Sequence, residues 1–397
     1  MYSYNFAPWP SFTQEEADAA QRVLLSNKVN YWTGQEGREF EKEFAAFAGT
    51  SHAIAVANGT LALDLILAGM GIGAHYGGSK DDEIIVTPRS FMASVSTVAN
   101  AGAKPVFVDV DRDSGNMSAA TIAPMITPKT KAIIAVHLAG WPCDMDEIMA
   151  LAEAHGVKVI EDCAQAHGGT YKGKPLGGIG HAAAWSFCQD KIMTTGGEGG
   201  MVTTSGVALW DRMWSFKDHG KSFDTVYNKK HPPGFRWLHE SFGTNWRLTE
   251  MQSAIGRIQL KRMPEWTKKR TANAQALIDA LGAFDCIRMP VTAPEIQNAL
   301  YKLYAYVEDD KLSEGWTRDR IAAAITAQGI PCMQGSCSEI YLEKAFDGTD
   351  WRPKHSLPVA KELGETSLMF LVHPTLSRAN IEDAVTAVRD VLSAATA

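Results

Sequence analysis

Short apolar runs alternate with amphipathic segments through the middle of the chain, from about residue 52 to residue 205. The runs have the length of strands, and the segments between them carry apolar residues at helical spacing. The predicted strands are His52–Val56, Glu83–Thr87, Pro105–Asp109, Ala132–Val136, Val157–Glu161, Ala182–Phe187 and Met201–Thr204. The helices predicted between them include Leu61–Ala68, Ser90–Ala101 and Met145–His155. This alternation predicts an α/β fold whose largely parallel sheet is covered by helices on both faces.

The regions on either side of this block are organised differently. An N-terminal helix is predicted where Thr13 and Glu16 have capping-box spacing. After the block, a loop-rich stretch from Lys217 to Phe242 precedes a helix from about Arg247 to Met263. Pro264 follows, and because proline disrupts helices we expect a separate helix from there to Leu281.

The last third of the chain predicts a smaller α+β domain. Tyr301–Val307 alternates like a strand, Arg318–Gln328 has helical spacing, and a C-terminal helix begins near Ser377. We therefore predict two domains, with the boundary between residues 263 and 264. Residues 1–263 form the N-terminal segment and large domain, and residues 264–397 form the small domain.

Composition and charge narrow the classes of function. Hydrophobic residues make up 45% and charged residues 21% of the 397 residues, values of a globular protein with a sizeable core. The net charge is −7, which argues against nucleic acid as a partner. No apolar run reaches the length of a membrane span, and the first residues lack a signal-peptide pattern, so we expect a cytoplasmic protein. Six scattered cysteines predict reduced thiols and neither disulfides nor a metal site.

One familiar nucleotide motif occurs in the wrong context. Gly69, Gly71 and Ala74 match a G-x-G-x-x-A dinucleotide fingerprint, but they follow a helical pattern and not a strand. We therefore interpret these glycines as the end of a helix.

Polar residues directly after the predicted strands suggest a shared site, because ligands of such sheets bind beyond the carboxyl ends of the strands. Gly59 and Thr60 open a helix after the first strand and could bind a phosphate, although a simple helix cap also explains them. Asp162 follows another strand and could face a protonated pyridine nitrogen, or could cap a helix or form a structural salt bridge.

A third site follows the strand that ends near Phe187. Lys191 lies at the expected sheet edge, where a desolvated lysine can act as an amine nucleophile towards a carbonyl group. Ser186, five residues earlier, could donate to a phosphate oxygen, and the glycine-rich run at 196–200 would let the backbone approach a flat ligand. Phe91 adds an aromatic face for stacking. A phosphate site, a carboxylate, an aromatic ring and a reactive lysine together describe a site for pyridoxal phosphate.

The chain also resembles a known family, the DegT/DnrJ/EryC1/StrS sugar aminotransferases, which have fold type I. The shared motifs are Tyr31-Trp32-Thr33-Gly34, Ala57-Asn58-Gly59-Thr60, Glu161-Asp162-Cys163-Ala164-Gln165, Ser186-Phe187 with Lys191, Gly196-Gly197-Glu198-Gly199-Gly200, Asn245-Trp246-Arg247 and His373-Pro374. They cover nearly the whole chain. The resemblance therefore implies a pyridoxal 5'-phosphate enzyme with a large domain and a smaller C-terminal domain.

Residue roles follow from the resemblance. It implies that Lys191 is the Schiff-base lysine and later moves a proton, that Asp162 pairs with the pyridine nitrogen, and that Gln165 hydrogen-bonds the phenolic oxygen. The residues that would hold the phosphate are Gly59, Thr60 and Ser186. Phe91 takes the stacking position, and Asn245 would reach the phosphate from the neighbouring subunit of a homodimer with shared active sites. No metal is expected.

The resemblance implies transfer of an amino group from L-glutamate to a nucleotide-linked ketosugar. A 4-keto-6-deoxyhexose is the first expectation, and a 3-ketosugar or an aminocyclitol ketone is the alternative. Family members that carry histidine in place of the Schiff-base lysine act as dehydratases, so Lys191 favours transamination. A lyase or dehydratase, and a binding protein without turnover, stay open as rivals. The segments Phe235–Trp246 and Gly335–Tyr341 match no pattern and are expected to line the substrate end.

Overall fold

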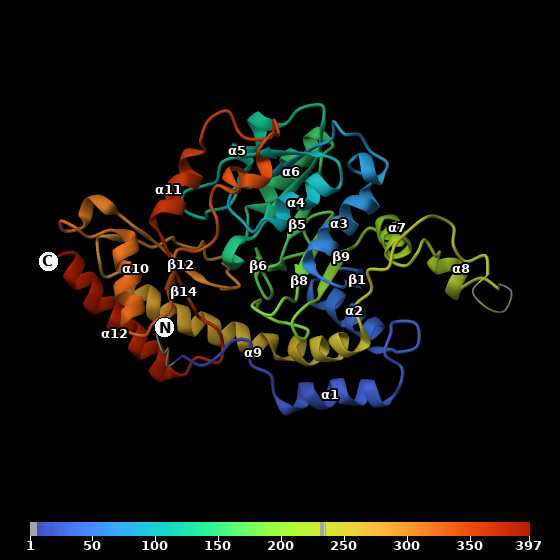
Figure 1. Cartoon of the computed structure of the whole chain (residues 1–397), viewed down its shortest axis with the longest axis horizontal. Helices are drawn as coiled ribbons and strands as arrows, with labels where there is room; N and C mark the ends of the chain where they lie inside the picture. The colour runs from blue at the N-terminus through green and yellow to red at the C-terminus, as the bar shows by residue number, and fades with distance from the viewer. Residues whose placement is uncertain (1–5, 231–233, 235) are drawn as a thin grey trace.

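A seven-stranded sheet forms the centre of the large domain (Figure 1). The computed structural model describes residues 6–230, 234 and 236–397. The strand order is β1-β9-β8-β5-β4-β2-β3. The strands are β1 His52–Val56, β2 Glu83–Val86, β3 Lys104–Phe107, β4 Thr130–Val136, β5 Lys158–Asp162, β8 Ala182–Ser186 and β9 Gly200–Thr204. All seven predicted strands are present, with ends shifted by one or two residues.

Every strand of this sheet except β9 runs in the same direction. The pairs β2–β3, β2–β4, β4–β5 and β5–β8 are parallel, whereas β9 is antiparallel to both β1 and β8. The carboxyl ends of β1, β2, β4, β5 and β8 therefore lie at one edge of the sheet. This arrangement brings the residues that follow these strands together, as the sequence predicts.

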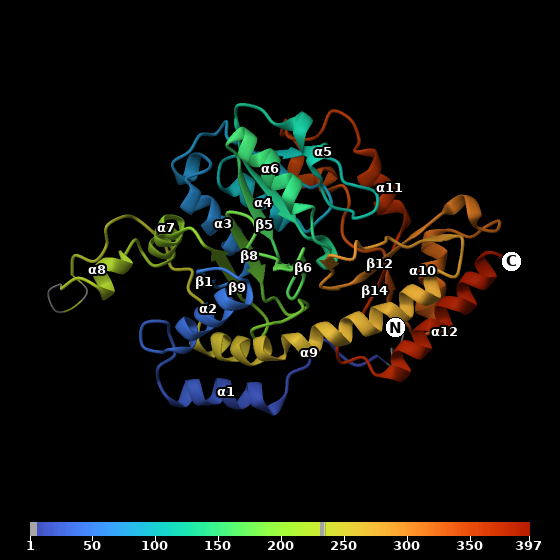
Figure 2. The same cartoon turned by 180° about the vertical axis from the view of Figure 1, so that it is seen from behind.

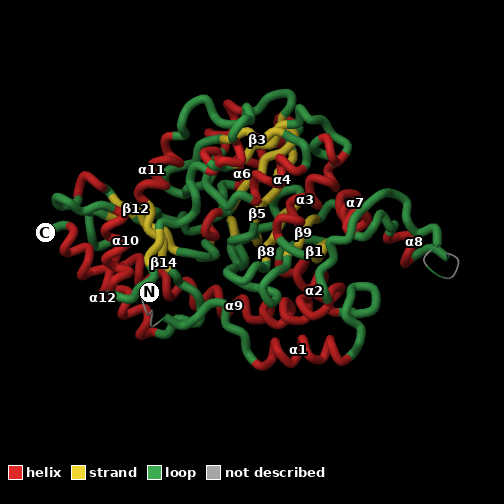
Figure 3. The backbone as a smooth tube through the Cα atoms, viewed as in Figure 1, coloured by secondary structure: helices red, strands yellow, loops and turns green. Residues whose placement is uncertain are grey.

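Helices cover both faces of the sheet (Figure 3). On one face the core contains residues of α3, α4 and α7. On the other face it contains residues of α2, α6 and α9. Their bounds are α2 Glu36–Phe47, α3 Gly59–Met70, α4 Ala93–Asn100, α6 Met145–His155, α7 Val207–Lys217 and α9 Glu250–Leu281. The short helix α5 spans Ala119–Ile122. The predicted two-sided α/β layering is confirmed.

The helix α9 corrects the prediction of two helices separated at Pro264. It runs without interruption from Glu250 to Leu281, with Pro264 inside it. Figures 1 and 2 show this long helix passing beneath both parts of the molecule. Packing explains its continuity, because α9 contacts α1 (Gln14–Leu25) and α2 at one end and α12 (Arg378–Ala395) at the other. These contacts offset the hydrogen bond that proline cannot make. The predicted boundary between residues 263 and 264 falls inside this helix and stays a prediction.

The C-terminal part has its own small sheet and core. Its antiparallel strands have the order β10-β12-β14-β13. The elements are β10 Ile287–Arg288, β12 Leu303–Val307, α10 Arg318–Ala327, β13 Cys332–Met333, α11 Pro358–Thr366 and β14 Ser367–Phe370. A third, three-stranded sheet joins β6 (Thr170–Tyr171), β7 (Lys174–Pro175) and β11 (Ile296–Gln297). Because β6 and β7 precede α9 and β11 follows it, this sheet links the two parts of the chain.

Local capping signals account for several helix ends. The Thr13 and Glu16 capping box opens α1, and Ser377 caps α12. Gly71 ends α3 in the left-handed conformation, which confirms that the G-x-G-x-x-A match is a helix end. None of the described helices is long and apolar enough to cross a membrane.

The stretch predicted as a loop after residue 217 is more structured than expected. Lys217 is the fully buried last residue of α7, and Lys221 is 7% exposed. A short helix, α8, spans Phe223–Tyr227. In the same stretch, Lys229 pairs with Asp224 at 2.7 Å. Lys217 and Lys221 are therefore shielded from solvent, which the prediction of a loop did not anticipate.

Candidate active site

A cavity of about 1100 Å³ lies at the carboxyl edge of the central sheet. Seven of the eight predicted site residues line it, namely Gly59, Thr60, Phe91, Asp162, Gln165, Ser186 and Lys191. They come from four separate segments of the chain, each of which follows or ends a strand of the sheet. The parallel strand directions therefore gather them into one site.

The start of α3 forms one end of the cavity. The side chain of Asn58 caps this helix by accepting the N–H of Leu61 at 2.9 Å. The N–H groups of Gly59 and Thr60 precede the first intrahelical bond, and both residues line the cavity. Ser186 lies so close that a Cβ atom on Gly59 would be 2.7 Å from the Ser186 Cβ. Free N–H groups, a helix dipole and a hydroxyl at one point form a fitting cradle for a phosphate group.

Asp162 ends β5 and is 6% exposed. One carboxylate oxygen accepts the hydroxyl of Ser94 at 2.7 Å, and the other accepts the N–H of Ala164 at 3.1 Å. The bond to Ala164 closes a local turn, and no described helix begins there, so Asp162 does not cap a helix. Within the described part of the chain, no ion pair to Asp162 is found at 4 Å or less. The Asp162 carboxylate accepts two hydrogen bonds but has no cation as a partner, so its negative charge can stabilise a positive group of a ligand.

The amide of Gln165 has a defined orientation. Its oxygen accepts the backbone N–H of Ala139 at 2.7 Å. Because this oxygen is fixed by an N–H donor, the side-chain NH₂ is the free end of the amide. Gln165 lines the cavity and can therefore donate to an anionic oxygen of a ligand, such as a phenolate.

Lys191 lies in the segment between β8 and β9, and its backbone is held on two sides. Its N–H donates to the carbonyl of Cys188 at 3.0 Å, and its carbonyl accepts the indole N–H of Trp9 at 2.8 Å. The ammonium nitrogen lies 5.1 Å from the centre of the Tyr301 ring. Among the described residues, the side chain of Lys191 makes no ion pair shorter than 4 Å. Its amine is thus positioned in the cavity without a fixed partner.

Charged groups from the C-terminal part complete the surroundings of Lys191. The Tyr301 hydroxyl donates to the carboxylate of Asp190. Burial alone would raise the pKa of Asp190, but the Lys191 charge and this hydrogen bond hold it below its ordinary value. Burial lowers the pKa of Arg270 to about 9, and burial together with Arg270 lowers the pKa of Lys302 to about 8. Two further cations, Arg270 and Lys302, therefore lie near Lys191 together with the carboxylate of Asp190.

The remaining predicted residues divide between the cavity and the surface. Phe91 is 70% exposed at the cavity wall, as a stacking ring requires. Asn245 is exposed and does not line the cavity, and its backbone pairs with that of Asp218. From the unassigned segment Gly335–Tyr341, four residues line the cavity, namely Gly335, Ser336, Cys337 and Ile340.

Two predicted stretches contribute little to the cavity of their own chain. No described residue of the 235–246 stretch lines it, and Phe235 lies outside the described residues. Of the glycine-rich run at 196–200, only Glu198 does. A Cβ atom on Gly200 would lie 2.3 Å from the carbonyl oxygen of Asn58, so this glycine permits close contact between backbones and not with a ligand.

His137, Glu161 and Cys163 form a buried cluster behind the cavity, with ligand atoms close enough to hold a metal. Hydrogen bonds already use the ligand atoms of His137 and Glu161. His137 Nδ1 accepts the backbone N–H of Cys143, and its Nε2 lies 3.1 Å from a carboxylate oxygen of Glu161. The Glu161 carboxylate also accepts three backbone N–H groups between residues 177 and 180. The cluster fits a hydrogen-bonded support for β5, and the expectation of no metal stays a prediction.

Comparison with known proteins identifies the family. The family model described as "DegT/DnrJ/EryC1/StrS aminotransferase family" matches residues 10–389. The chain belongs to this family. The resemblance inferred from the sequence motifs is therefore confirmed.

Relatives of the same family match over most of their length. The chain is 34% identical to the dTDP-3-amino-3,4,6-trideoxy-alpha-D-glucose transaminase of Streptomyces venezuelae, over 94% of this chain and 92% of that protein. It is 36% identical to the GDP-perosamine synthase of Caulobacter vibrioides, over 91% and 92%. The crystal structure of an aminotransferase from Psychrobacter cryohalolentis is 60% identical, with a TM-score of 0.95 over 99% of this chain and 100% of that one. The predicted fold type I is confirmed, and the family consists of enzymes that depend on pyridoxal phosphate.

Several residues of this family member's site carry no motif in the sequence. Trp9, Asp190, Tyr301 and Lys302 lie beside Lys191, yet none stands out from its neighbours in the chain. The bond from Trp9 to Lys191 spans 182 positions. Asp190 offers the only signal, because it directly precedes the predicted lysine.

Proposed function

We propose that this protein is a pyridoxal phosphate-dependent aminotransferase. The observation that carries the proposal is that Lys191, Asp162, Gln165 and the phosphate cradle line one cavity. The residues fit the cofactor, because the cradle offers unused N–H groups and Gln165 offers a free NH₂. When bound, the cofactor would supply a carbonyl carbon for the lysine and a ring that delocalises negative charge.

Each predicted residue has one task in this proposal. Asp162 holds the protonated pyridine nitrogen by charge, and Gln165 donates to the phenolic oxygen. Phe91 covers one face of the ring. Lys191 binds the cofactor covalently and, once released by an incoming amine, uses its free Nζ atom first to take a proton from the substrate carbon and then to return a proton within the site.

The proposed acceptor is a nucleotide-linked ketosugar, most specifically a 4-keto-6-deoxyhexose, and the proposed donor is L-glutamate. Support comes from the relatives, which are named for amino sugars linked to dTDP or GDP. A cavity of about 1100 Å³ admits a nucleotide sugar. The product would be an amino sugar for a surface polysaccharide or another glycoconjugate. A 3-ketosugar and an aminocyclitol ketone are the alternative acceptors.

The proposed assembly is a homodimer with shared active sites, in which Asn245 reaches the phosphate of the partner. Asn245 is exposed and lies outside its own cavity, as a residue that serves the neighbouring subunit must. Mixing an inactive Lys191→Ala chain with an inactive Asn245→Ala chain tests this. Recovery of activity up to about one quarter would support shared sites. A monomer in light scattering would contradict the assembly.

The reaction is tested with the purified holoenzyme. Addition of L-glutamate is expected to change the cofactor absorbance and release one equivalent of 2-oxoglutarate, and a nucleotide-linked 4-ketosugar should then gain an amino group in mass spectrometry. Lys191→Arg is the matched control because it keeps the charge but removes the nucleophile. A dehydratase or lyase would release pyruvate or ammonia, and a binding protein would show no absorbance change. Either outcome contradicts the proposal.

A further inference from the structure

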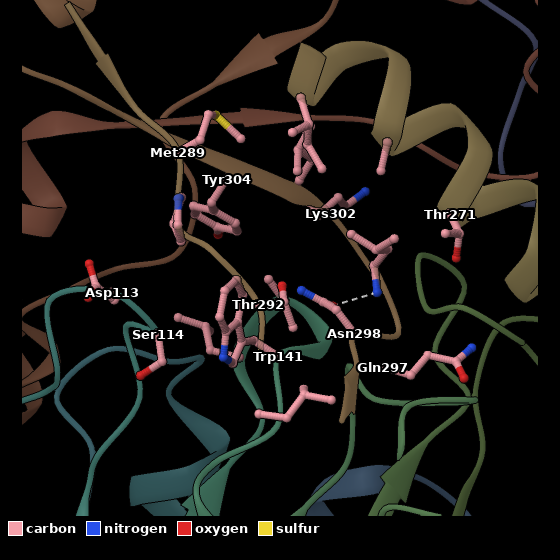
Figure 4. A pocket seen from close by; sticks show the side chains of 18 of the residues that line it. Asp113, Ser114, Trp141, Thr271, Met289, Thr292, Gln297, Asn298, Lys302 and Tyr304 are labelled. Carbon is pink, nitrogen blue, oxygen red and sulfur yellow. Dashed lines mark hydrogen bonds between the residues drawn. The ribbon is translucent and has the colours of Figure 1, made fainter. Parts of the chain in front are cut away.

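A second cavity of about 270 Å³ lies beside the reaction cavity. Figure 4 shows it between α9, the loops that carry Trp141 and Thr292, and the strand that carries Tyr304. Lys302 and Tyr304 line both cavities, so their side chains form the wall between them. A group bound in the second cavity would therefore lie next to the reaction centre.

The wall residue Lys302 carries a positive charge that makes no direct ion pair among the described residues. Its ammonium nitrogen is 4.8 Å from the centre of the Tyr301 ring, which Lys191 also approaches. Within the described residues, this nitrogen has neither a hydrogen bond nor an ion pair. The nearby carboxylate of Asp190 already accepts the Tyr301 hydroxyl, and the other charged neighbour, Arg270, is a buried cation. A half-buried ammonium that no carboxylate contacts directly is unfavourable, so the site favours an incoming anion.

Arg89 supplies a second cation to the same cavity. Its side chain is 1% exposed, and it donates to Ser338 at 2.9 Å and to Tyr306 at 3.1 Å. Its remaining terminal nitrogen, Nη2, is buried without a hydrogen-bond partner among the described residues. A buried guanidinium nitrogen with an unused donor is rare, because it loses its hydration without compensation.

Among the described residues that line the cavity, none is a buried acid that could balance these charges. The only carboxylate among its described lining residues is Asp113, whose side chain is 75% exposed and pairs with Arg288 at 3.3 Å. The other polar residues of the lining are uncharged, and Thr271, Gln297 and Asn298 are drawn in Figure 4. They can donate hydrogen bonds to the oxygens of a small anion.

We propose that the second cavity is a carboxylate subsite of the reaction centre, in which Lys302 and Arg89 bind a carboxylate of a substrate. The proposal rests on the proposed aminotransferase function. The carboxylate belongs either to the amino-acid donor or to an acidic sugar, and both present the same group to the two cations. An ammonium and a planar guanidinium with a free donor suit a carboxylate well.

The test compares Lys302→Met with the wild type. This change removes the charge and keeps the length of the side chain. Lys302→Arg restores the charge, and Lys311→Met is the matched control because Lys311 is an exposed lysine outside both cavities. Thermal unfolding of all three variants shows whether they fold. We expect Lys302→Met to be as stable as the wild type, because it removes an unpaired charge.

The first measurement is the concentration of L-glutamate that half-saturates the absorbance change of the holoenzyme. The second is the concentration of a nucleotide-linked ketosugar, with or without a carboxylate at C6, that half-saturates its amination. For the substrate whose carboxylate binds in the subsite, Lys302→Met should raise the half-saturating concentration tenfold or more. The limiting rate with that substrate should change less than threefold. Lys302→Arg should recover most of the loss. A shift with glutamate assigns the subsite to the donor, and a shift confined to the acidic sugar assigns it to the acceptor.

Binding without turnover gives an independent readout. Succinate, a dicarboxylate that cannot react, should raise the unfolding temperature of the wild-type holoenzyme and not that of Lys302→Met. Unchanged half-saturation for every substrate, together with equal succinate binding, would overturn the subsite. If no sugar is aminated by the wild type, the proposed function fails, while the glutamate and succinate measurements still decide the subsite.

Discussion

Asp162→Asn separates the charge of this residue from its hydrogen bonds. The asparagine oxygen can accept the N–H of Ala164 as before, and its NH₂ group can donate to the hydroxyl of Ser94, which in turn can donate to Ser90 at 3.0 Å. The local network therefore keeps a partner for each group. We expect the free energy of unfolding to change by less than about 1 kcal/mol.

The catalytic effect of the same change should be far larger. A carboxylate about 3 Å from a pyridinium nitrogen contributes roughly 5 kcal/mol at an effective dielectric constant near 20. Asp162 is 6% exposed, so bulk water screens this attraction little. If about 3 to 4 kcal/mol of it is realised in the transition state, turnover falls by about two to three powers of ten.

Steady-state transamination and cofactor absorbance measure this effect. Ser94→Ala is the matched control, because it removes the hydrogen bond to Asp162 but keeps the negative charge. We expect the control to lose no more than about tenfold in turnover. Turnover of Asp162→Asn within about threefold of the wild type, with cofactor bound, would refute the charge argument. Asp162 would then be a turn-forming residue only.

Three further changes test the surroundings of the site. Glu161→Gln places an amide NH₂ against backbone N–H donors and should lower the free energy of unfolding by about 2 kcal/mol at neutral pH. Burial raises the pKa of Glu161, but its hydrogen bonds outweigh burial and hold the pKa below the ordinary value. The stability that the ionised carboxylate contributes is therefore lost as the pH falls through this lowered pKa. Urea titrations at several pH values should show a smaller loss of stability at low pH in the variant than in the wild type. Trp9→Phe removes the bond to the Lys191 carbonyl and should reduce turnover several-fold with unchanged cofactor content, measured by absorbance. Gly59→Ala places a methyl group in the phosphate cradle and should weaken cofactor binding at least tenfold in equilibrium dialysis.

Local patterns along the chain are enough to predict the strands of the central sheet and the residues that follow those strands in the candidate site. Each strand is a short apolar run between turn residues, and the residues after parallel strands meet at one edge of the sheet. Gly59, Asp162, Ser186 and Lys191 could therefore be predicted as neighbours although they are far apart in sequence. The capping residues Thr13 and Ser377 likewise fix helix starts through contacts within four residues.

Long-range packing determined the features that those local patterns do not predict: the surroundings of Lys191, the continuity of α9 and the burial of charged side chains. Trp9, Arg270 and Lys302 come together around Lys191 only because the N-terminal segment and α9 both pass under the centre of the molecule. Helix α9 continues through Pro264 because it packs against helices at both ends, a contribution that local helix propensity does not include. The burial of Lys302 and Arg89, which leaves donors without a direct partner beside the reaction cavity, depends on two separate parts of the chain closing over them. Desolvation is a property of that packing, so it appears only in the tertiary structure.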